Sequence, residues 1–274
     1  MNEVLRVDSS YSTAMTKRNP PGIAKIWPSV YFYSRLLRII YKASRLAKAG
    51  RYDGKEWAKS SLDVLELLER IGVQIEISGL AEFGAFDGPC VIIGNHMSMM
   101  ETLVMPVMIQ PMKPVTYVIK ESLLTYPVFR HVMRSRNPVA VTRTNPRQDL
   151  KTVLEEGAKR LEEGTSIIVF PQTTRTTAFD PAEMTSIGVK LAKKAGVPIV
   201  PLALRTDAWM NGRYLKDLGR INVLRKVHFA FGPALRVEGK GNEAQHRITE
   251  FITAKLTGWN KGDQCASGHV VNQG

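Results

Sequence analysis

The chain has 274 residues, which at about 150 residues per domain corresponds to one large domain or two small ones. Its 38 lysines and arginines exceed its 25 aspartates and glutamates, giving a formal charge of +13 that favours an anionic partner. Two cysteines, Cys90 and Cys265, exclude a disulfide framework, a cysteine-rich zinc cluster and the class of small disulfide-rich secreted proteins.

Residues 1–25 are polar and are expected to form a flexible arm. They lack the basic region, apolar core and small-residue cleavage site of a signal peptide. The best candidate for a membrane span, residues 89–112, contains His96 and Glu101, so no run reaches the roughly 18–20 apolar residues that a span needs. The sequence therefore predicts neither a signal peptide nor a transmembrane helix.

Residues 26–72 are predicted to form a helical segment, with one amphipathic helix at 27–49 and a second at 55–71. In the first helix, apolar and aromatic residues alternate with cations that recur every three or four positions, as one helix face requires. A basic helix with an apolar opposite face is typical of a segment that lies at a membrane surface. The alternative is a helix packed on the core with its basic face in water.

Residues 73–256 alternate short apolar runs with helical stretches, which is the pattern of an α/β domain. Strands are predicted at 73–78, 90–93, 115–119, 139–142, 166–170, 199–204 and 227–231. Helices are predicted at 99–109, 122–134, 148–162, 182–195 and 243–256. We therefore expect a mostly parallel central sheet flanked by helices, followed at 257–274 by a mobile polar tail.

Four side chains that can bind an anion or transfer a proton follow predicted strands. They are His96, Lys120, Arg143 and, in a threonine-rich turn, Arg175. Ligands of open α/β sheets gather at the carboxyl ends of the strands, so these residues indicate one anion-binding reaction site. The alternative is that strand ends are loops, and loops are polar in any case.

Glu101 lies five residues after His96, so the two side chains can meet only if His96 precedes the helix. The turn at Gly94 and Asn95 permits this placement, and its backbone amides are candidate donors to an oxyanion. A carboxylate on one imidazole nitrogen fixes the tautomer and leaves the other nitrogen to take a proton from a hydroxyl. The chain has no Gly-x-Ser-x-Gly elbow, and neither of its cysteines is placed with a histidine in a way that indicates a covalent intermediate.

Several sequence blocks resemble those of the glycerolipid acyltransferase family, to which 1-acylglycerol-3-phosphate acyltransferases belong. Asn95-His-Met-Ser-Met-Met-Glu101 is similar to the family's His-x4-Asp/Glu motif. Residues 136–143 are similar to the second block, which ends in Arg, and residues 169–176 resemble the Phe-Pro-Glu-Gly-Thr-Arg-Ser block. Residues 197–201 resemble the Val-Pro-Ile-x-Pro block, and residues 120–127 resemble the family's Lys-x-x-Leu stretch.

The resemblance implies transfer of a fatty acyl group from a coenzyme A or acyl carrier protein thioester to a lysophospholipid-like acceptor, by default lysophosphatidic acid, in phospholipid biosynthesis. His96 would be the general base and Glu101 its orienting carboxylate. The substrate-binding residues would be Lys120, Arg143, Thr174 and Arg175, which would hold the acceptor phosphate. No cofactor and no metal are expected. The expected location is the cytoplasmic face of a membrane, with peripheral attachment to its anionic surface.

Five departures from the family pattern affect these expectations. Glu101 replaces the commoner Asp, while Gln172 and Thr173 replace Glu and Gly. Asn137 and Thr142 replace the Gly and Asp that are usual in the second block. These changes leave open a non-glycerophosphate lipid acceptor, a catalytically silent lipid-binding homologue, or a thioesterase that uses water. The isoelectric point of about 9.8 also suits nucleic-acid binding, but no zinc spacing, helix-turn-helix signature or aromatic RNA-binding motif appears, so no nucleic-acid partner is expected.

Overall fold

The computed structural model describes residues 10–127, 129–172, 174–213 and 215–268, with side chains described as far as residue 262. Within these residues, eight strands form one sheet in the order β1-β2-β8-β7-β3-β6-β4-β5. The strands are β1 (Ser10–Ser12), β2 (Ile75–Ser78), β3 (Val91–Gly94), β4 (Val115–Lys120), β5 (Val139–Val141), β6 (Ser166–Val169), β7 (Ile199–Arg205) and β8 (Val227–Phe231). Only the pairs β1–β2 and β7–β8 among them are antiparallel. The predicted mostly parallel α/β fold is thus confirmed.

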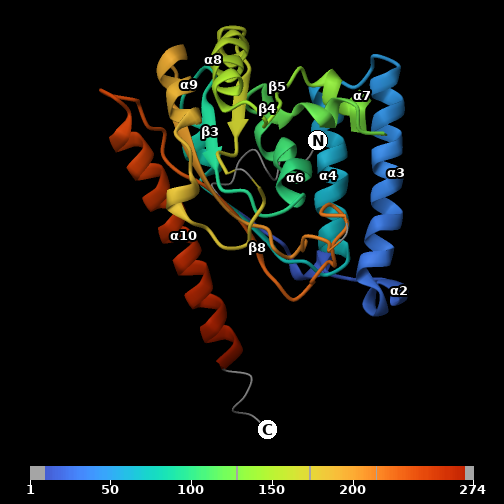
Figure 1. Cartoon of the computed structure of the whole chain (residues 1–274). Coiled ribbons are helices and arrows are strands. Elements are labelled where there is room, and N and C mark those ends of the chain that lie inside the picture. The colour runs from blue at the N-terminus through green and yellow to red at the C-terminus, as the bar shows by residue number, and fades with distance from the viewer. Residues whose placement is uncertain (1–9, 128, 173, 214, 269–274) are drawn as a thin grey trace.

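Helices cover both faces of the sheet. They are α2 (Gly22–Ile26), α3 (Pro28–Lys48), α4 (Gly54–Arg70), α5 (Leu80–Gly84), α6 (Met100–Ile109), α7 (Phe129–Ser135), α8 (Pro146–Glu162), α9 (Ile187–Ala195) and α10 (Asn242–Gly268), with 3₁₀ turns η1 (Met15–Lys17), η2 (Glu121–Leu124) and η3 (Pro181–Glu183). One apolar cluster packs α3, α4 and α6 on one face, and a second packs α8, α9 and α10 on the other (Figure 1). The central strand β3 is buried along its whole length, as expected for a parallel strand covered on both sides.

The structure differs from the expected flexible arm in residues 10–25. Strand β1 pairs with β2, with Tyr11 opposite Ile77. The hydroxyl groups of Tyr11 and Thr13 both donate to the carboxylate of Glu69 on α4, which is 1% exposed, and Lys17 Nζ lies 3.5 Å from it. These partners are more than fifty residues away in the chain, so local composition could not indicate them.

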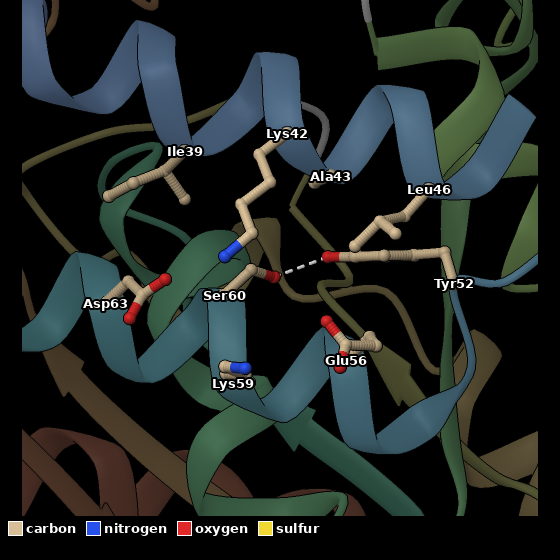
Figure 2. Close-up of a pocket in the computed structure, with 9 residues that line it drawn as sticks. All are labelled: Ile39, Lys42, Ala43, Leu46, Tyr52, Glu56, Lys59, Ser60 and Asp63. Atoms are coloured by element: carbon tan, nitrogen blue, oxygen red, sulfur yellow. Dashed lines mark hydrogen bonds between the residues drawn. The ribbon is translucent and has the colours of Figure 1, made fainter.

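Helix α3 buries one stripe and exposes the rest. Phe32, Leu36, Ile40 and Ala43 face inward at helical spacing, and Phe32 packs edge-to-face on Trp209 at 4.9 Å. Figure 2 shows the contact of α3 with α4, in which Lys42 extends over α4 and the Tyr52 hydroxyl bonds the Ser60 hydroxyl. The predicted amphipathic helix therefore packs on the protein through one face and keeps a cationic face outside.

The last helix is longer than predicted. Helix α10 continues through Gly268, whereas the sequence pattern ends the helix at residue 256 and predicts a mobile tail beyond it. Trp259 stacks on His228 of β8, with ring centroids 4.7 Å apart and planes 13° apart. This contact holds the first added turn against the sheet and joins residues 31 positions apart, so the local polar composition did not reveal it.

Candidate active site

The chain leaves the sheet at Gly94 in a way that fixes the position of His96. Asn95, which is 1% exposed, donates from Nδ2 to the Leu204 carbonyl and accepts from the Leu204 N–H, both at 2.8 Å. Its side chain therefore continues the pairing of β3 with β7 by one residue. The backbone is free to turn, and α6 begins only at Met100, so His96 precedes the helix as the sequence requires.

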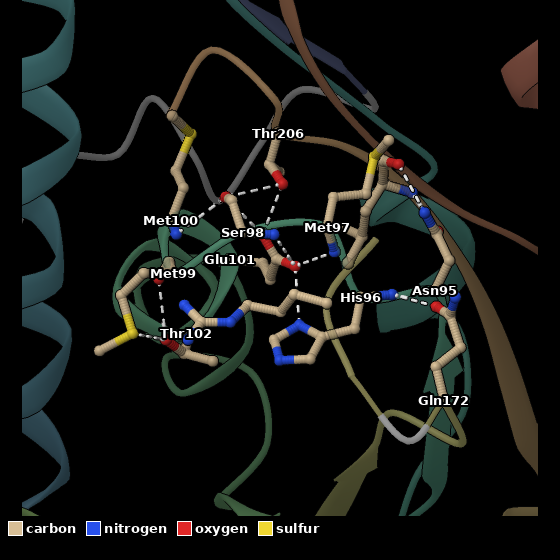
Figure 3. Close-up of polar contacts among 12 residues, drawn as sticks. Asn95, His96, Met97, Ser98, Met99, Met100, Glu101, Thr102, Gln172 and Thr206 are labelled. Carbon is tan, nitrogen blue, oxygen red and sulfur yellow. Dashed lines mark hydrogen bonds and ion pairs between the residues drawn. The ribbon is translucent and has the colours of Figure 1, made fainter. Parts of the chain in front are cut away.

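His96 and Glu101 meet directly (Figure 3). The distance from His96 Nδ1 to Glu101 Oε1 is 2.9 Å, and the Glu101 side chain is fully buried. Because an ionised carboxylate can only accept a hydrogen bond, Nδ1 carries the hydrogen. In the neutral ring the lone pair then lies on Nε2, which has no hydrogen-bond partner among the described residues.

Several further donors surround the Glu101 carboxylate. Met97 N–H and Ser98 N–H donate to Oε1 at 2.7 and 2.9 Å, and the Thr206 hydroxyl donates to Oε2 at 2.5 Å. Burial alone would raise the pKa of Glu101, but the hydrogen bond and charge of His96, with the bonds from Thr206 and Ser98, lower it below its usual value. Glu101 is therefore held as a carboxylate despite complete burial.

Thr206 and Ser98 were missed in the sequence. The Ser98 hydroxyl lies 3.0 Å from Glu101 Oε2 and 2.9 Å from the Thr206 hydroxyl, and both residues are completely buried (Figure 3). Thr206 directly follows β7, so the strand-end pattern that indicated His96 also applies to it. Its relation to Glu101 appears only when β7 is known to lie beside β3.

Two aromatic side chains lie on one side of the imidazole. The Phe170 ring, just beyond β6, stacks on His96 with centroids 4.4 Å apart and planes 5° apart, and Tyr117 of β4 lies next to Phe170 at 6.3 Å. Burial, followed by the nearby Glu101 charge, raises the pKa of Tyr117 well above its usual value. Tyr117 therefore stays a neutral phenol. The His96 ring packs on Phe170, which packs in turn on Tyr117, so one side of the imidazole contacts uncharged aromatic rings.

Gln172 supports the backbone of His96. Its Oε1 accepts from the His96 N–H at 2.6 Å, while its Nε2 is buried with no hydrogen-bond partner among the described residues. The amide oxygen thus makes a contact that a Glu carboxylate oxygen could also make. Thr173, the other departure from the family block, lies outside the described residues.

The backbone N–H groups that follow the Gly94 turn are already engaged. His96 N–H donates to Gln172, and Met97 and Ser98 N–H donate to Glu101. The suggestion that amides near this turn stabilise an oxyanion is therefore wrong for these three groups, because each has a protein acceptor.

The loop that carries Arg175 lies against the backbone of His96. Thr176 N–H donates to the His96 carbonyl at 3.0 Å, which fixes the loop after β6 against the histidine. Arg175 Nη2 pairs with Asp217 at 2.6 Å, and its Nη1 is buried without a partner among the described residues. The adjacent Thr174 is exposed and accepts from Lys216 Nζ at 3.2 Å.

Lys120 and Arg143 lie at the same sheet edge but further from His96. Lys120 ends β4, two strands from β3, and Arg143 follows β5, three strands away or about 14 Å at the usual strand spacing. Arg143 has a left-handed backbone with φ of 63°, and its N–H donates to Asp149 at 2.7 Å. The structure thus places the predicted cations at the sheet edge where His96 lies, and among them the loop of Arg175 is the one bonded to the His96 backbone.

The described part of the chain holds neither a metal-binding cluster nor a helix suited to span a membrane. Among the described residues, no group of three or more His, Cys, Asp or Glu side chains is arranged to hold a metal ion. Within the same part of the chain, no helix combines the length and apolar character needed to cross a bilayer.

Comparison with known proteins gives a consistent result. Residues 74–205 match the family described as Acyltransferase. This chain, of which the match covers slightly less than half, resembles known acyltransferases in that stretch. It is similar to a 1-acyl-sn-glycerol-3-phosphate acyltransferase of Pseudomonas aeruginosa, with 28% identity over 74% of this chain and 75% of that protein. A probable enzyme of the same name from Mycoplasma genitalium is 31% identical over 42% of this chain and 44% of that protein.

The fold comparison agrees with the sequence comparison. The crystal structure of a 1-acyl-sn-glycerophosphate acyltransferase from Thermotoga maritima superposes with a TM-score of 0.63, covering 87% of this chain and 97% of that one at 21% identity. At this identity the likeness shows a shared α/β fold, and the sequence comparison adds a similarity to acyltransferases over residues 74–205.

Proposed function

We propose that this acyltransferase moves a fatty acyl group from a coenzyme A or acyl carrier protein thioester to the free hydroxyl of 1-acyl-sn-glycerol-3-phosphate. The contact between His96 Nδ1 and Glu101 Oε1 carries the proposal, because it leaves Nε2 able to take a proton. The printed names of the similar proteins support this acceptor. The product would enter phospholipid biosynthesis.

In the proposed reaction, His96 Nε2 removes the proton of the acceptor hydroxyl as that oxygen attacks the thioester carbonyl carbon. The tetrahedral oxyanion then collapses, the carbon–sulfur bond breaks, and the thiolate takes the proton from His96. The ionised Glu101 stabilises the imidazolium that exists between these two steps. His96 ends the cycle neutral, as it began, and no atom changes its oxidation state, so the reaction requires no cofactor.

Arg175 is the proposed first ligand of the acceptor phosphate, because its loop is hydrogen-bonded to His96 and its guanidinium matches phosphate geometry. Thr174 is adjacent to it. Lys120 and Arg143 would act further along the sheet edge, on the phosphate or on the anionic part of the donor. Asp217, which pairs with Arg175 here, would have to give way to the phosphate.

We further propose peripheral attachment to the anionic cytoplasmic face of a membrane. Residues 15–51 contain nine cations and no acid, namely Lys17, Arg18, Lys25, Arg35, Arg38, Lys42, Arg45, Lys48 and Arg51. Trp27, Val30 and Leu37 of the same segment are more than 60% exposed. Exposed apolar side chains among many cations suit the headgroup layer of an anionic bilayer.

The test is transfer of labelled acyl groups from acyl-CoA and from acyl carrier protein to 1-acylglycerol-3-phosphate and to other lysolipids. We expect transfer to the phosphate-bearing acceptor, and a loss of about 10²-fold or more in kcat for His96→Ala. Glu101→Gln should retain part of the activity. Circular dichroism and thermal unfolding check that the variants fold.

Equal turnover by His96→Ala would refute the mechanism. Release of free fatty acid without lysolipid acylation would instead identify a thioesterase. Transfer only to acceptors without phosphate would refute the proposed substrate while leaving the role of His96 intact.

A further inference from the structure

Large apolar side chains are exposed in two segments that lie far apart in the sequence. The first segment is residues 15–41, in which Ile23, Ile26 and Trp27 are 53–73% exposed. The second is residues 210–224 in the connection between β7 and β8, in which Leu215, Leu218 and Leu224 are 55–90% exposed. Tyr126 is the other large apolar residue exposed in the described part of the chain.

The fold brings these two segments together. The Tyr33 hydroxyl donates to the Gly219 carbonyl at 2.6 Å, and the Ile221 N–H donates to Ser29 Oγ at 2.9 Å. Trp209, just before the second segment, packs on both Phe32 and Tyr33. In Figure 1 the connection, in orange, accordingly lies close to α2 and the start of α3 at one end of the molecule.

The charge of the second segment matches that of the first. Residues 210–224 carry Arg213, Lys216 and Arg220, against the single acid Asp217. Asp217 is itself paired with Arg175. The two segments therefore offer a partner exposed apolar side chains with a cationic surround, which suits lipid with anionic headgroups rather than an acidic protein surface alone.

The second segment also contacts the loop of His96 and the loop of Arg175, which are the two parts of the proposed site. Asn211 Nδ2 donates to the Met97 carbonyl at 3.0 Å, one residue after His96. Asp217 and Lys216 bond Arg175 and Thr174, which follow β6. A lipid surface in contact with residues 210–224 would therefore lie on the side of the molecule where His96 and Arg175 are found.

We propose that residues 210–213 and 215–224 form a second membrane-contacting element, which enters the headgroup layer of an anionic bilayer together with α2 and the start of α3. The inference rests on the membrane attachment proposed above and extends it to a segment outside the N-terminal helices. Lipid acceptors would then reach His96 from the bilayer, past this segment.

The test uses the full-length protein and vesicles of phosphatidylcholine with phosphatidylglycerol. We expect the double variant Leu215→Ser, Leu218→Ser to bind these vesicles about tenfold more weakly in sedimentation. Arg220→Glu should also weaken binding, whereas the matched change Lys194→Glu on α9 should not, since α9 covers the other face of the sheet. Leu218→Trp should add fluorescence that brominated lipids quench, which a merely destabilised protein would not show.

Two comparisons separate this inference from the proposed function. If Ile26→Ser with Trp27→Ser weakens binding while the Leu215, Leu218 double variant binds normally and Leu218→Trp is not quenched, the second element is refuted and membrane attachment stands. If neither pair weakens binding, attachment itself is refuted. Acyl transfer to a soluble short-chain acceptor should stay unchanged in the Leu215, Leu218 double variant, and its loss would show a structural role instead.

Discussion

Glu101 receives more hydrogen bonds than orienting one histidine requires. Its Oε1 accepts hydrogen bonds from His96 and two backbone amides, while its Oε2 accepts hydrogen bonds from the hydroxyls of Ser98 and Thr206. A Glu side chain is one methylene longer than the commoner Asp, so it extends further from α6, toward the end of β7. Its pKa is lowered in the folded state, so the ionised group stabilises the fold above pH about 4.3, and this stabilisation is lost as the pH falls through the lower folded value.

Thr206→Val removes the hydroxyl donor to Oε2 and leaves the shape of the side chain unchanged. Hydrogen bonds to charged groups contribute about 1.5–3 kcal/mol, so we expect a loss of about tenfold in kcat and a small loss of stability. Because Thr206 lowers the pKa of Glu101, its removal should move the acid limb of the kcat–pH profile to higher pH.

Thr206→Ser keeps the hydroxyl, so it should restore both kcat and the pH at which the acid limb of the kcat–pH profile falls. A Thr206→Val profile that is lowered evenly at all pH values would show that Thr206 supports packing rather than the ionisation of Glu101. The readout is kcat at saturating acceptor, measured across the acid range.

At the level of elements, the sequence predicted seven strands because each is a short apolar run between helices. It did not predict strand order, since β3 pairs with β6 and β7, which follow it by more than seventy residues. The roles of Thr206, Gln172 and Asp217 depend on that order and therefore could not be predicted. Strand β1 was missed because three polar and aromatic residues form a strand only against β2.

The turn between β2 and α5 depends on Gly79. Its φ is +78°, and a Cβ there would lie 2.0 Å from the Phe231 carbonyl oxygen of β8. Gly79→Ala should therefore lower the free energy of unfolding by about 2 kcal/mol or more, from left-handed strain plus a backbone clash. Denaturant unfolding measures the change.

Gly50→Ala is the matched control, because Gly50 has φ of +70° and no atom within 4 Å of its Cβ position. It should lose only the strain contribution of about 1 kcal/mol. Equal losses at the two glycines would show that the approach of Phe231 to Gly79 has no energetic consequence.

At the scale of the molecule, charge is distributed unevenly. The N-terminal segment and the connection between β7 and β8 hold many of the cations and almost no acids, and the contacts of Tyr33 and Ser29 place them at one end. A protein with this distribution should orient itself on an anionic surface before any side chain enters it. Attraction of this kind is long-range and depends on ionic strength.

Salt should therefore weaken binding to anionic vesicles. Between 0.1 and 1 M salt the Debye length falls from about 10 Å to about 3 Å, and we expect affinity to fall more than tenfold over this range. Binding that remains at high salt would come from the apolar side chains. Vesicles of phosphatidylcholine alone should show little salt dependence, and an equal response with both lipids would contradict an electrostatic origin.

The buried carboxylate of Glu69 has a practical consequence for work on the N-terminus. A shortened chain that starts after residue 20 would remove Tyr11, Thr13 and Lys17, which are the groups that contact that carboxylate in the described part of the chain. The carboxylate, left buried without a partner, would then destabilise α4, which packs on α6, the helix that carries Glu101. Loss of activity after such trimming would therefore report damage to the interior and say little about lipid contact.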